Sequence, residues 1–225
     1  MIKINKLSKS IKYQHPLEID YLDINKGYIY SILGHNGSGK STFLKILYQI
    51  TDYDKGDINI NNEGFYEDTV HKYFAYNPQQ TFFLRGSLKD NFEYLYKYSK
   101  NDNLLSKDKL NDLIEEFSLT HRLNTNVRKL SGGEKAKAQF IRTLVLNKDF
   151  NLFDEPMASM DFKTIELVEK KLRELKENNK TVILVTHDFS QAKRISDEII
   201  FMENLMFIGK YKNEDFFHKL KKGLF

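Results

Sequence analysis

The sequence contains no cysteine. Disulfides, zinc–thiolate sites and cysteine nucleophiles are therefore excluded, and the chain fits a reducing compartment. Long hydrophobic runs are absent too. The densest apolar stretches are Tyr28–Leu33, Thr181–Val185 and Ile199–Met202, far shorter than the ~20 residues that a membrane-spanning helix needs. We therefore expect that the chain does not cross a membrane, and that another chain holds it wherever it works at one.

The first ten residues carry lysines but no apolar segment of the kind found in secretory signals. Apolar residues make up 40% of the chain and charged residues 29%, which is typical of a globular protein. A length of 225 residues fits one domain, or one domain with an inserted lobe. The net charge is only +4. With lysines scattered among acids, this favours a solvated surface of mixed sign over a face for nucleic acid.

Three short apolar runs are typical of strands buried on both faces of a sheet: Tyr28–Leu33, Phe150–Phe153 and Thr181–Val185. A residue capable of chemistry lies at or just past the end of each run, namely Gly34, Asp154 and His187. Strands that alternate with helices predict a parallel α/β sheet, in which ligands bind beyond the carboxyl ends of the strands.

Helical spacing of apolar residues predicts helices over Asp161–Lys180 and Lys135–Leu146. No buried-strand run occurs between Gln79 and Ser131, where Leu110–Phe117 has the pattern of an amphipathic helix. We therefore predict a helical subdomain over residues 79–143. It is inserted into an α/β core made of residues 1–78 and 144–225, which together form one domain. Alternation in Ile2–Leu22 and Gly56–Asn62 indicates an antiparallel sheet at the N-terminal side of the core.

A glycine-rich segment follows the first apolar run. It fits the pattern G-x-x-x-x-G-K-[ST] between a predicted strand and a predicted helix, and this context argues against a glycine-rich turn with an incidental lysine. Its backbone N–H groups and the helix dipole favour an anion. Lys40 is expected to contact the β- and γ-phosphates of a nucleotide, and Ser41 to bind Mg²⁺. The predicted nucleotide-binding residues are Gly34, His35, Asn36, Gly37, Ser38, Gly39, Lys40, Ser41 and Thr42, with no side-chain role for His35.

Two adjacent carboxylates, Asp154 and Glu155, end the second apolar run. Such a pair is costly to bury unless a cation lies nearby. With the phosphate loop in the same chain, we predict that Asp154 holds the Mg²⁺ of the nucleotide and that Glu155 orients or deprotonates the attacking water. An ordinary acidic turn is the alternative. Asn151 lies inside the run, and its amide needs hydrogen-bond partners if the strand is buried.

A second anion-binding element opens the helix predicted over Lys135–Leu146. Ser131 is a good N-cap residue, and Gly132 and Gly133 leave backbone N–H groups uncovered. A plainly capped helix start explains this segment equally well when it is taken alone.

Together these segments resemble the ATP-binding cassette (ABC) family. The phosphate loop matches its Walker A motif, Leu130–Glu134 (LSGGE) its signature motif, and Leu152–Pro156 its Walker B motif with a catalytic glutamate. Gln79 resembles the Q-loop glutamine, Ala158–Asp161 the D-loop, and His187 the switch histidine. The resemblance covers nearly the full chain. It implies a P-loop NTPase (RecA-like) α/β core with an antiparallel β subdomain and an inserted α-helical subdomain.

The resemblance also implies partners and roles. In this family two cassettes stack head to tail around ATP, so Ser131, Gly132 and Gly133 would serve the nucleotide of a second ABC ATPase subunit. His187 would contact the γ-phosphate. Gln79 would sense Mg²⁺ and the attacking water, and would link the site to transmembrane permease subunits. The implied catalytic residues are Glu155, His187 and Gln79, and the implied metal-binding residues are Ser41, Gln79 and Asp154.

The family usually stacks an aromatic side chain on adenine, some distance before Walker A. Tyr13 is the candidate here, although it lies out of the usual register. Tyr21 is another candidate, and an ordinary role in a sheet explains either tyrosine equally well.

The segment Pro78–Asn91 resembles the region after the Q-loop of exporter cassettes, where Phe82 and Phe83 would contact the coupling helix of a transporter. Packing inside the helical lobe explains the two phenylalanines equally well. The extra loop that exporters carry before the signature is shortened at Thr125–Lys129. The sequence therefore favours export without deciding the direction of transport.

We expect an ATP-hydrolysing subunit that energises transport by separately encoded membrane chains. It would be cytoplasmic, held by a membrane partner at the inner face of the cell membrane. A soluble cassette ATPase acting on nucleic acid or ribosomes is the alternative. The long coiled coil or second cassette of such relatives is absent. The net charge of +4 is also too small to indicate a basic surface for binding nucleic acid. A sensor that binds ATP without hydrolysis is disfavoured by the presence of Glu155 and His187.

Overall fold

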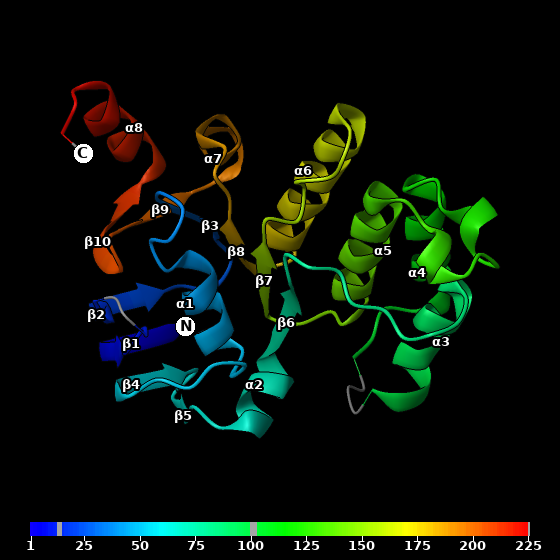
Figure 1. Cartoon of the computed structure of the whole chain (residues 1–225), viewed down its shortest axis with the longest axis horizontal. Helices are drawn as coiled ribbons and strands as arrows, with labels where there is room; N and C mark the ends of the chain where they lie inside the picture. The colour runs from blue at the N-terminus through cyan, green and yellow to red at the C-terminus, as the bar shows by residue number, and fades with distance from the viewer. Residues whose placement is uncertain (13–14, 100–102, 225) are drawn as a thin grey trace.

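A single large sheet organises the computed structural model, which describes residues 1–12, 15–99 and 103–224 (Figure 1). Its ten strands lie in the order β5-β4-β1-β2-β10-β9-β3-β8-β7-β6. The strands are β1 Ile2–Lys9, β2 Leu17–Ile24, β3 Ile29–Leu33, β4 Lys55–Ile60, β5 Glu63–Gly64, β6 Phe74–Asn77, β7 Phe150–Asp154, β8 Thr181–Val185, β9 Glu198–Glu203 and β10 Met206–Lys212. The helices are α1 Lys40–Leu47, α2 Glu67–Tyr73, α3 Leu88–Tyr98, α4 Lys107–Glu116, α5 Gly132–Val145, α6 Phe162–Glu177, α7 Phe189–Ile195 and α8 Asn213–Lys221.

The strands β9, β3, β8, β7 and β6 run parallel and form the centre and one edge of the sheet. Every residue of β3, β7 and β8 is buried, because both faces of these strands are covered. Ile183 and Val185 of β8 pack with α1 on one face, and Val182 and Leu184 pack with α5 and α6 on the other. Continuous apolar runs are the sequence pattern that such two-sided burial produces.

The other half of the sheet is antiparallel. β1 pairs with β2 on one side and with β4 on the other. Ile2 and Ile4 of β1 are fully buried, while Lys3 between them and Asn5 after them are exposed. The alternating sequence pattern therefore marks a strand with one face on the core and one face toward solvent. These strands lie beside α1 in Figure 1, and they close that end of the core.

The chain between β6 and β7 folds into α3, α4 and α5, which lie together at one end of the molecule, away from the antiparallel strands (Figure 1). The amphipathic pattern predicted in this region corresponds to α4, whose Leu110, Leu113 and Ile114 are buried. The division of the chain at residues 79 and 143 stays a prediction. No helix of the described residues is long and apolar enough to cross a bilayer.

Two local details follow from the sequence. α6 begins after Asp161, whose Oδ1 accepts a hydrogen bond from the backbone N–H of Thr164 at 2.9 Å, as an N-cap residue does. The buried amide of Asn151 finds partners for its nitrogen only, since Nδ2 donates to the carbonyl of Lys148 at 3.0 Å while Oδ1 has none.

Candidate nucleotide-binding site

Four neighbouring parallel strands end at the same edge of the sheet. Gly34 follows β3, Glu155 follows β7, and Gln79 and His187 lie two residues beyond the ends of β6 and β8. In open α/β sheets this edge is where ligands bind. Residues that are far apart in the sequence are thereby brought to one place.

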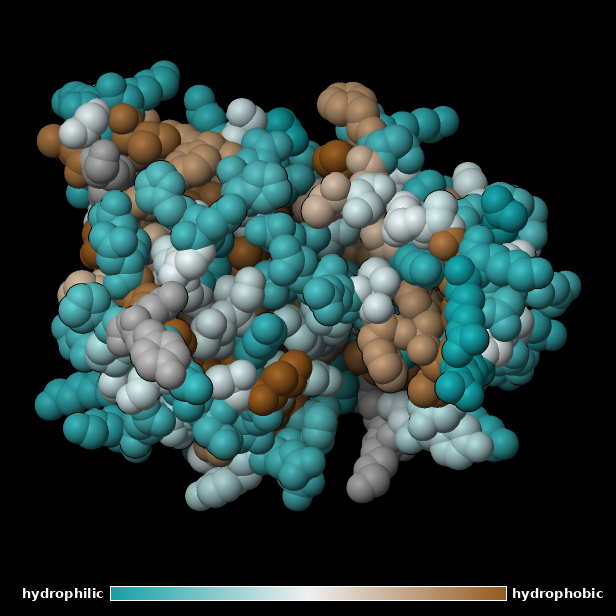
Figure 2. Space-filling model, viewed as in Figure 1, coloured by the Kyte–Doolittle hydropathy of each residue, from teal (hydrophilic) through white to brown (hydrophobic). Residues whose placement is uncertain are grey.

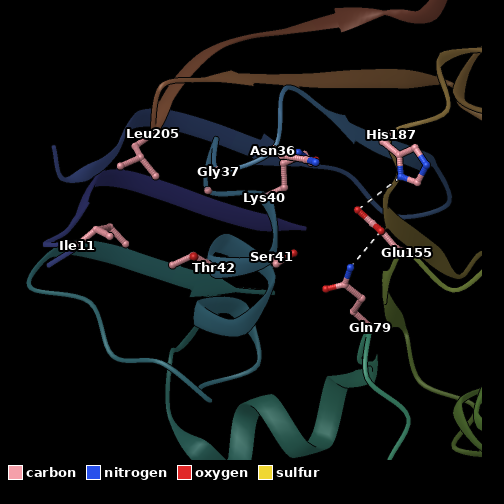
Figure 3. A pocket seen from close by; sticks show the side chains of 11 residues that line it. Ile11, Asn36, Gly37, Lys40, Ser41, Thr42, Gln79, Glu155, His187 and Leu205 are labelled. Atoms are coloured by element: carbon pink, nitrogen blue, oxygen red, sulfur yellow. Dashed lines mark hydrogen bonds and ion pairs between the residues drawn. The ribbon is translucent and has the colours of Figure 1, made fainter. Parts of the chain in front are cut away.

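A cavity of about 550 Å³ opens at this edge (Figure 3). Its lining residues are Ile11, Asn36, Gly37, Gly39, Lys40, Ser41, Thr42, Gln79, Glu155, His187 and Leu205. Figure 3 shows Gln79, Glu155 and His187 at one end and the apolar side chains of Ile11 and Leu205 at the other, with the loop before α1 between them. A long ligand with one polar end therefore fits the cavity with that end beside Glu155 and its other end beside Ile11 and Leu205.

The loop before α1 depends on glycine at two positions. Gly34 has φ +153°, and a Cβ atom there would lie 2.0 Å from the carbonyl oxygen of Met202. Gly39 has φ +95°, and its Cβ would lie 2.7 Å from Leu17. Any other residue would collide or be strained at these positions. The remaining loop residues are His35, Asn36 and Gly37, which are exposed, and Ser38, which is buried and donates its backbone N–H to the carbonyl of His35 at 3.1 Å.

Lys40 is a buried cation whose hydrogen bonds go to the loop. Its Nζ donates to the carbonyl oxygens of Gly34 and His35, each at 2.8 Å, and no ion pair joins it to a carboxylate among the described residues. Burial lowers the pKa of Lys40, while the negative charges of Glu155 and Asp154 oppose that shift. The lysine thus holds a positive charge at the centre of the cavity without a direct counter-ion.

Asp154 is 1% exposed and lies behind the loop. The hydroxyl of Ser41 donates to Oδ1 at 2.8 Å, and the hydroxyl of Tyr76 lies 3.4 Å from Oδ2. Burial raises the pKa of Asp154, the hydrogen bond from Ser41 lowers it, and the neighbouring charge of Glu155 raises it. Ser41 and Asp154 place hard oxygen atoms side by side at the phosphate loop.

Glu155 stands at the polar end of the cavity with two polar neighbours. Gln79 Nε2 donates to Oε2 at 3.1 Å, and Nδ1 of His187 lies 3.6 Å from Oε1 (Figure 3). The backbone of Glu155 has φ +48°, a left-handed conformation that is unusual for a glutamate and is often found at functional sites. This backbone turns the side chain away from the sheet and toward the cavity. The arrangement can hold and deprotonate a water molecule at this end.

The residues of the predicted second anion site lie elsewhere. Ser131 caps α5, since its Oγ accepts from the N–H of Glu134 at 3.2 Å and Glu134 Oε2 accepts from the N–H of Ser131 at 2.8 Å. Gly132 and Gly133 form the first turn of this helix. None of the three lines the cavity around Lys40, so this chain does not bring its two predicted anion sites together.

The end of the cavity opposite Glu155 contains residues that the sequence did not predict. Ile11 precedes β2, and Leu205 lies in the turn between β9 and β10. Neither belongs to a recognisable pattern, although Ile11 comes two positions before the predicted base-stacking residue in the sequence. Tyr13 lies outside the described residues. Tyr21, the alternative, is 53% exposed and does not line the cavity.

Comparison with known proteins agrees with this geometry. The family model described as "ABC transporter" matches residues 17–158. The arginine transport ATP-binding protein ArtM of Bacillus subtilis is 29% identical, and the alignment covers 96% of this chain and 93% of the relative. The tungstate uptake system ATP-binding protein TupC of Peptoclostridium acidaminophilum is also 29% identical, over 90% of this chain and 94% of the relative.

A solved structure of a dimeric ATP-binding cassette, in a post-hydrolysis state bound to ADP and Pi, superposes with a TM-score of 0.80. It is 26% identical, with 95% of this chain and 99% of that chain covered. The mixed α/β P-loop fold is therefore that of ABC ATPases. The family match, the relatives and the site lead to one conclusion: the chain is an ATP-binding ATPase of the ABC transporter family.

Proposed function

We propose that this chain hydrolyses ATP with Mg²⁺ to drive uptake through separately encoded membrane chains. One observation carries the proposal: Lys40, Ser41 and Glu155 line a single cavity, and the Ser41 hydroxyl donates at 2.8 Å to Asp154, which is buried behind it. A cation, a pair of hard oxygen donors and a carboxylate are the groups that phosphoryl transfer to water needs.

The triphosphate of ATP lies along the loop Gly34–Thr42, with backbone N–H groups and Lys40 facing its charges. The γ-phosphate lies at the end of the cavity near Glu155, and the nucleoside extends toward Ile11 and Leu205. The polarity of the two ends supports this direction. Stacking of Tyr13 on the base stays a prediction.

The residues present fit Mg²⁺. Ser41 Oγ and Asp154 Oδ1 lie 2.8 Å apart and are both hard oxygen donors. Within the described part of the chain, no three His, Asp or Glu side chains come together as a protein cage for a metal. This suits Mg²⁺, which usually takes few protein ligands together with substrate phosphates and water. Bound there, the ion would neutralise charge on the β- and γ-phosphates, and Gln79 lies close enough to Glu155 to respond to it.

In the proposed reaction the Oε atoms of Glu155 accept a proton from the attacking water as its oxygen bonds to the γ-phosphorus. The bond from the γ-phosphorus to the bridging oxygen breaks, and ADP leaves. His187, whose side chain is 66% exposed beside Glu155, donates a hydrogen bond to the γ-phosphate. Gln79 orients the water through its amide.

The signature residues serve a second cassette in this proposal. Ser131, Gly132 and Gly133 lie outside the chain's own cavity, at the start of α5. A second copy or a related cassette, placed head to tail, would bring them to its γ-phosphate. ATP would then close the dimer, and hydrolysis would reopen it.

A membrane partner would dock beside the helical lobe, at the inner face of the membrane and on its cytoplasmic side. Apolar side chains gather there next to the boundary with the core (Figure 2). Phe82 is 67% exposed, whereas Phe83 packs partly against the core of α3–α5. The two phenylalanines therefore have different roles in this proposal. Phe82 is available for contact with a membrane partner, and Phe83 packs inside the helical lobe. We propose no nucleic-acid partner.

The proposed direction of transport is uptake. The sequence favoured export on one short segment after the Q-loop, and that prediction gains no support from the relatives. The name of the relative TupC describes uptake, and its alignment extends over 90% of this chain. Reconstitution with the membrane chains tests the direction. Movement of substrate toward the side that carries the cassette supports uptake, and movement away from it contradicts the proposal.

The function itself is tested on the purified full chain and on native membranes. Calorimetry should detect ATP binding that Mg²⁺ strengthens, and a phosphate-release assay should detect turnover. In native cells the chain should sediment with membranes and be extracted together with a hydrophobic partner. Well-folded protein that neither binds ATP nor sediments with membranes would refute the proposal.

A further inference from the structure

Tyr76 is a buried phenol that the chemistry above does not use. It lies on β6, the strand at one edge of the sheet, and is 8% exposed. Its hydroxyl is 3.4 Å from Oδ2 of Asp154, while the hydroxyl of Ser41 donates to Oδ1 at 2.8 Å. Each oxygen of the carboxylate therefore meets one hydroxyl, from α1 on one side and from β6 on the other.

The position of Tyr76 is set by packing. Tyr76 lies opposite Leu152 in the parallel pairing of β6 with β7, and its ring points to the face of the sheet that α1 covers. There the ring of Tyr48, at the end of α1, packs on it with centroids 5.3 Å apart. With its ring held there, Tyr76 has its hydroxyl near the end of β7, where Asp154 lies.

We propose that Tyr76 is a positioning residue that fixes the plane of the Asp154 carboxylate, so that Oδ1 stays beside Ser41. The terminal torsion of an aspartate is broad, and the carboxylate can turn freely when one oxygen is unrestrained. Among the described residues, no other side chain donates to Oδ2. This inference rests on the proposed function, in which Oδ1 and Ser41 face Mg²⁺.

The test replaces Tyr76 by phenylalanine, which keeps the ring and its packing on Tyr48 and removes only the hydroxyl. Binding of a non-hydrolysable ATP analogue is measured by calorimetry across a magnesium titration and again in EDTA. We expect the magnesium concentration at half-maximal effect to rise about fivefold, as the loss of one weak hydrogen bond to a charged group implies. Affinity in EDTA should equal that of the parent, because the carboxylate plane matters only with the metal.

Tyr48→Phe is the matched control, because it removes a hydroxyl from the same pair of rings that, among the described residues, makes no hydrogen bond to Asp154, and it should titrate like the parent. In an Asp154→Asn background, Tyr76→Phe should cause no further shift. The inference is overturned if Tyr76→Phe titrates like the parent or weakens binding equally in EDTA. If the parent itself shows no effect of magnesium, the proposed function fails first, so the two failures can be told apart.

Discussion

Replacing Lys40 by methionine removes one buried charge and keeps most of the apolar stem. At 4 Å and an effective dielectric constant of 20, a pair of unit charges contributes about 4 kcal/mol. To meet a phosphate, Lys40 has to give up hydrogen bonds to the carbonyls of Gly34 and His35, both at 2.8 Å. These cost about 1 kcal/mol each in net terms. About 2 kcal/mol remain, so the Kd for MgATP should rise about 30-fold.

The same substitution should leave folding almost unchanged. Burial lowers the pKa of Lys40, so its charge at neutral pH costs folding free energy that methionine does not. This gain offsets the two lost hydrogen bonds, and we expect the free energy of unfolding to change by less than about 1 kcal/mol. Calorimetry with MgATP and unfolding in urea measure the two quantities separately.

The control is Lys170→Met, which removes a 68% exposed charge whose one ion-pair partner in the described part of the chain is Glu174, at 3.9 Å. It should bind MgATP like the parent. If Lys40→Met weakens binding less than about threefold, or if Lys170→Met weakens it to the same extent, the electrostatic reasoning is wrong.

Two further predictions concern stability. Gly34→Ala should lower the free energy of unfolding by more than about 3 kcal/mol, because its Cβ would lie 2.0 Å from the carbonyl of Met202. Gly37→Ala, with nothing within 4 Å, should cost about 1 kcal/mol in urea unfolding, and equal losses would contradict the account. Glu134→Ala should cost about 1 kcal/mol at neutral pH, since the hydrogen bond from Ser131 N–H and then Arg122 lower the pKa of Glu134. The folded pKa lies below the unfolded one, so this stabilisation is present at neutral pH and lost in acid, and unfolding curves of parent and variant should converge there.

The sequence predicted best what local rules decide. β3, β7 and β8 are continuous apolar runs, because each is covered on both faces. The loop before α1 is recognisable because its glycines are required by backbone geometry at Gly34 and Gly39. Parallel strands that share an edge then explain why the residues at their ends meet.

Other features depend on tertiary contacts that no local pattern records. β6 has only four residues and follows α2 directly without a turn signal, so it was not predicted. The contact between Tyr76 and Asp154 joins residues 78 positions apart. Ile11 and Leu205 meet the cavity only because β2 and β10 become neighbours in the sheet. The left-handed backbone conformation of Glu155 also cannot be recognised from the sequence.

The most direct test of the account is the rate of phosphate release by Glu155→Gln. Glutamine keeps the size of the side chain that lies beside Gln79 and His187, and it cannot accept the proton of the attacking water. We predict that MgATP binding is retained, that turnover falls at least about 100-fold, and that ATP traps a dimer detectable by light scattering. Phosphate release at the parent's rate would contradict the central claim that the Glu155 carboxylate performs the hydrolysis.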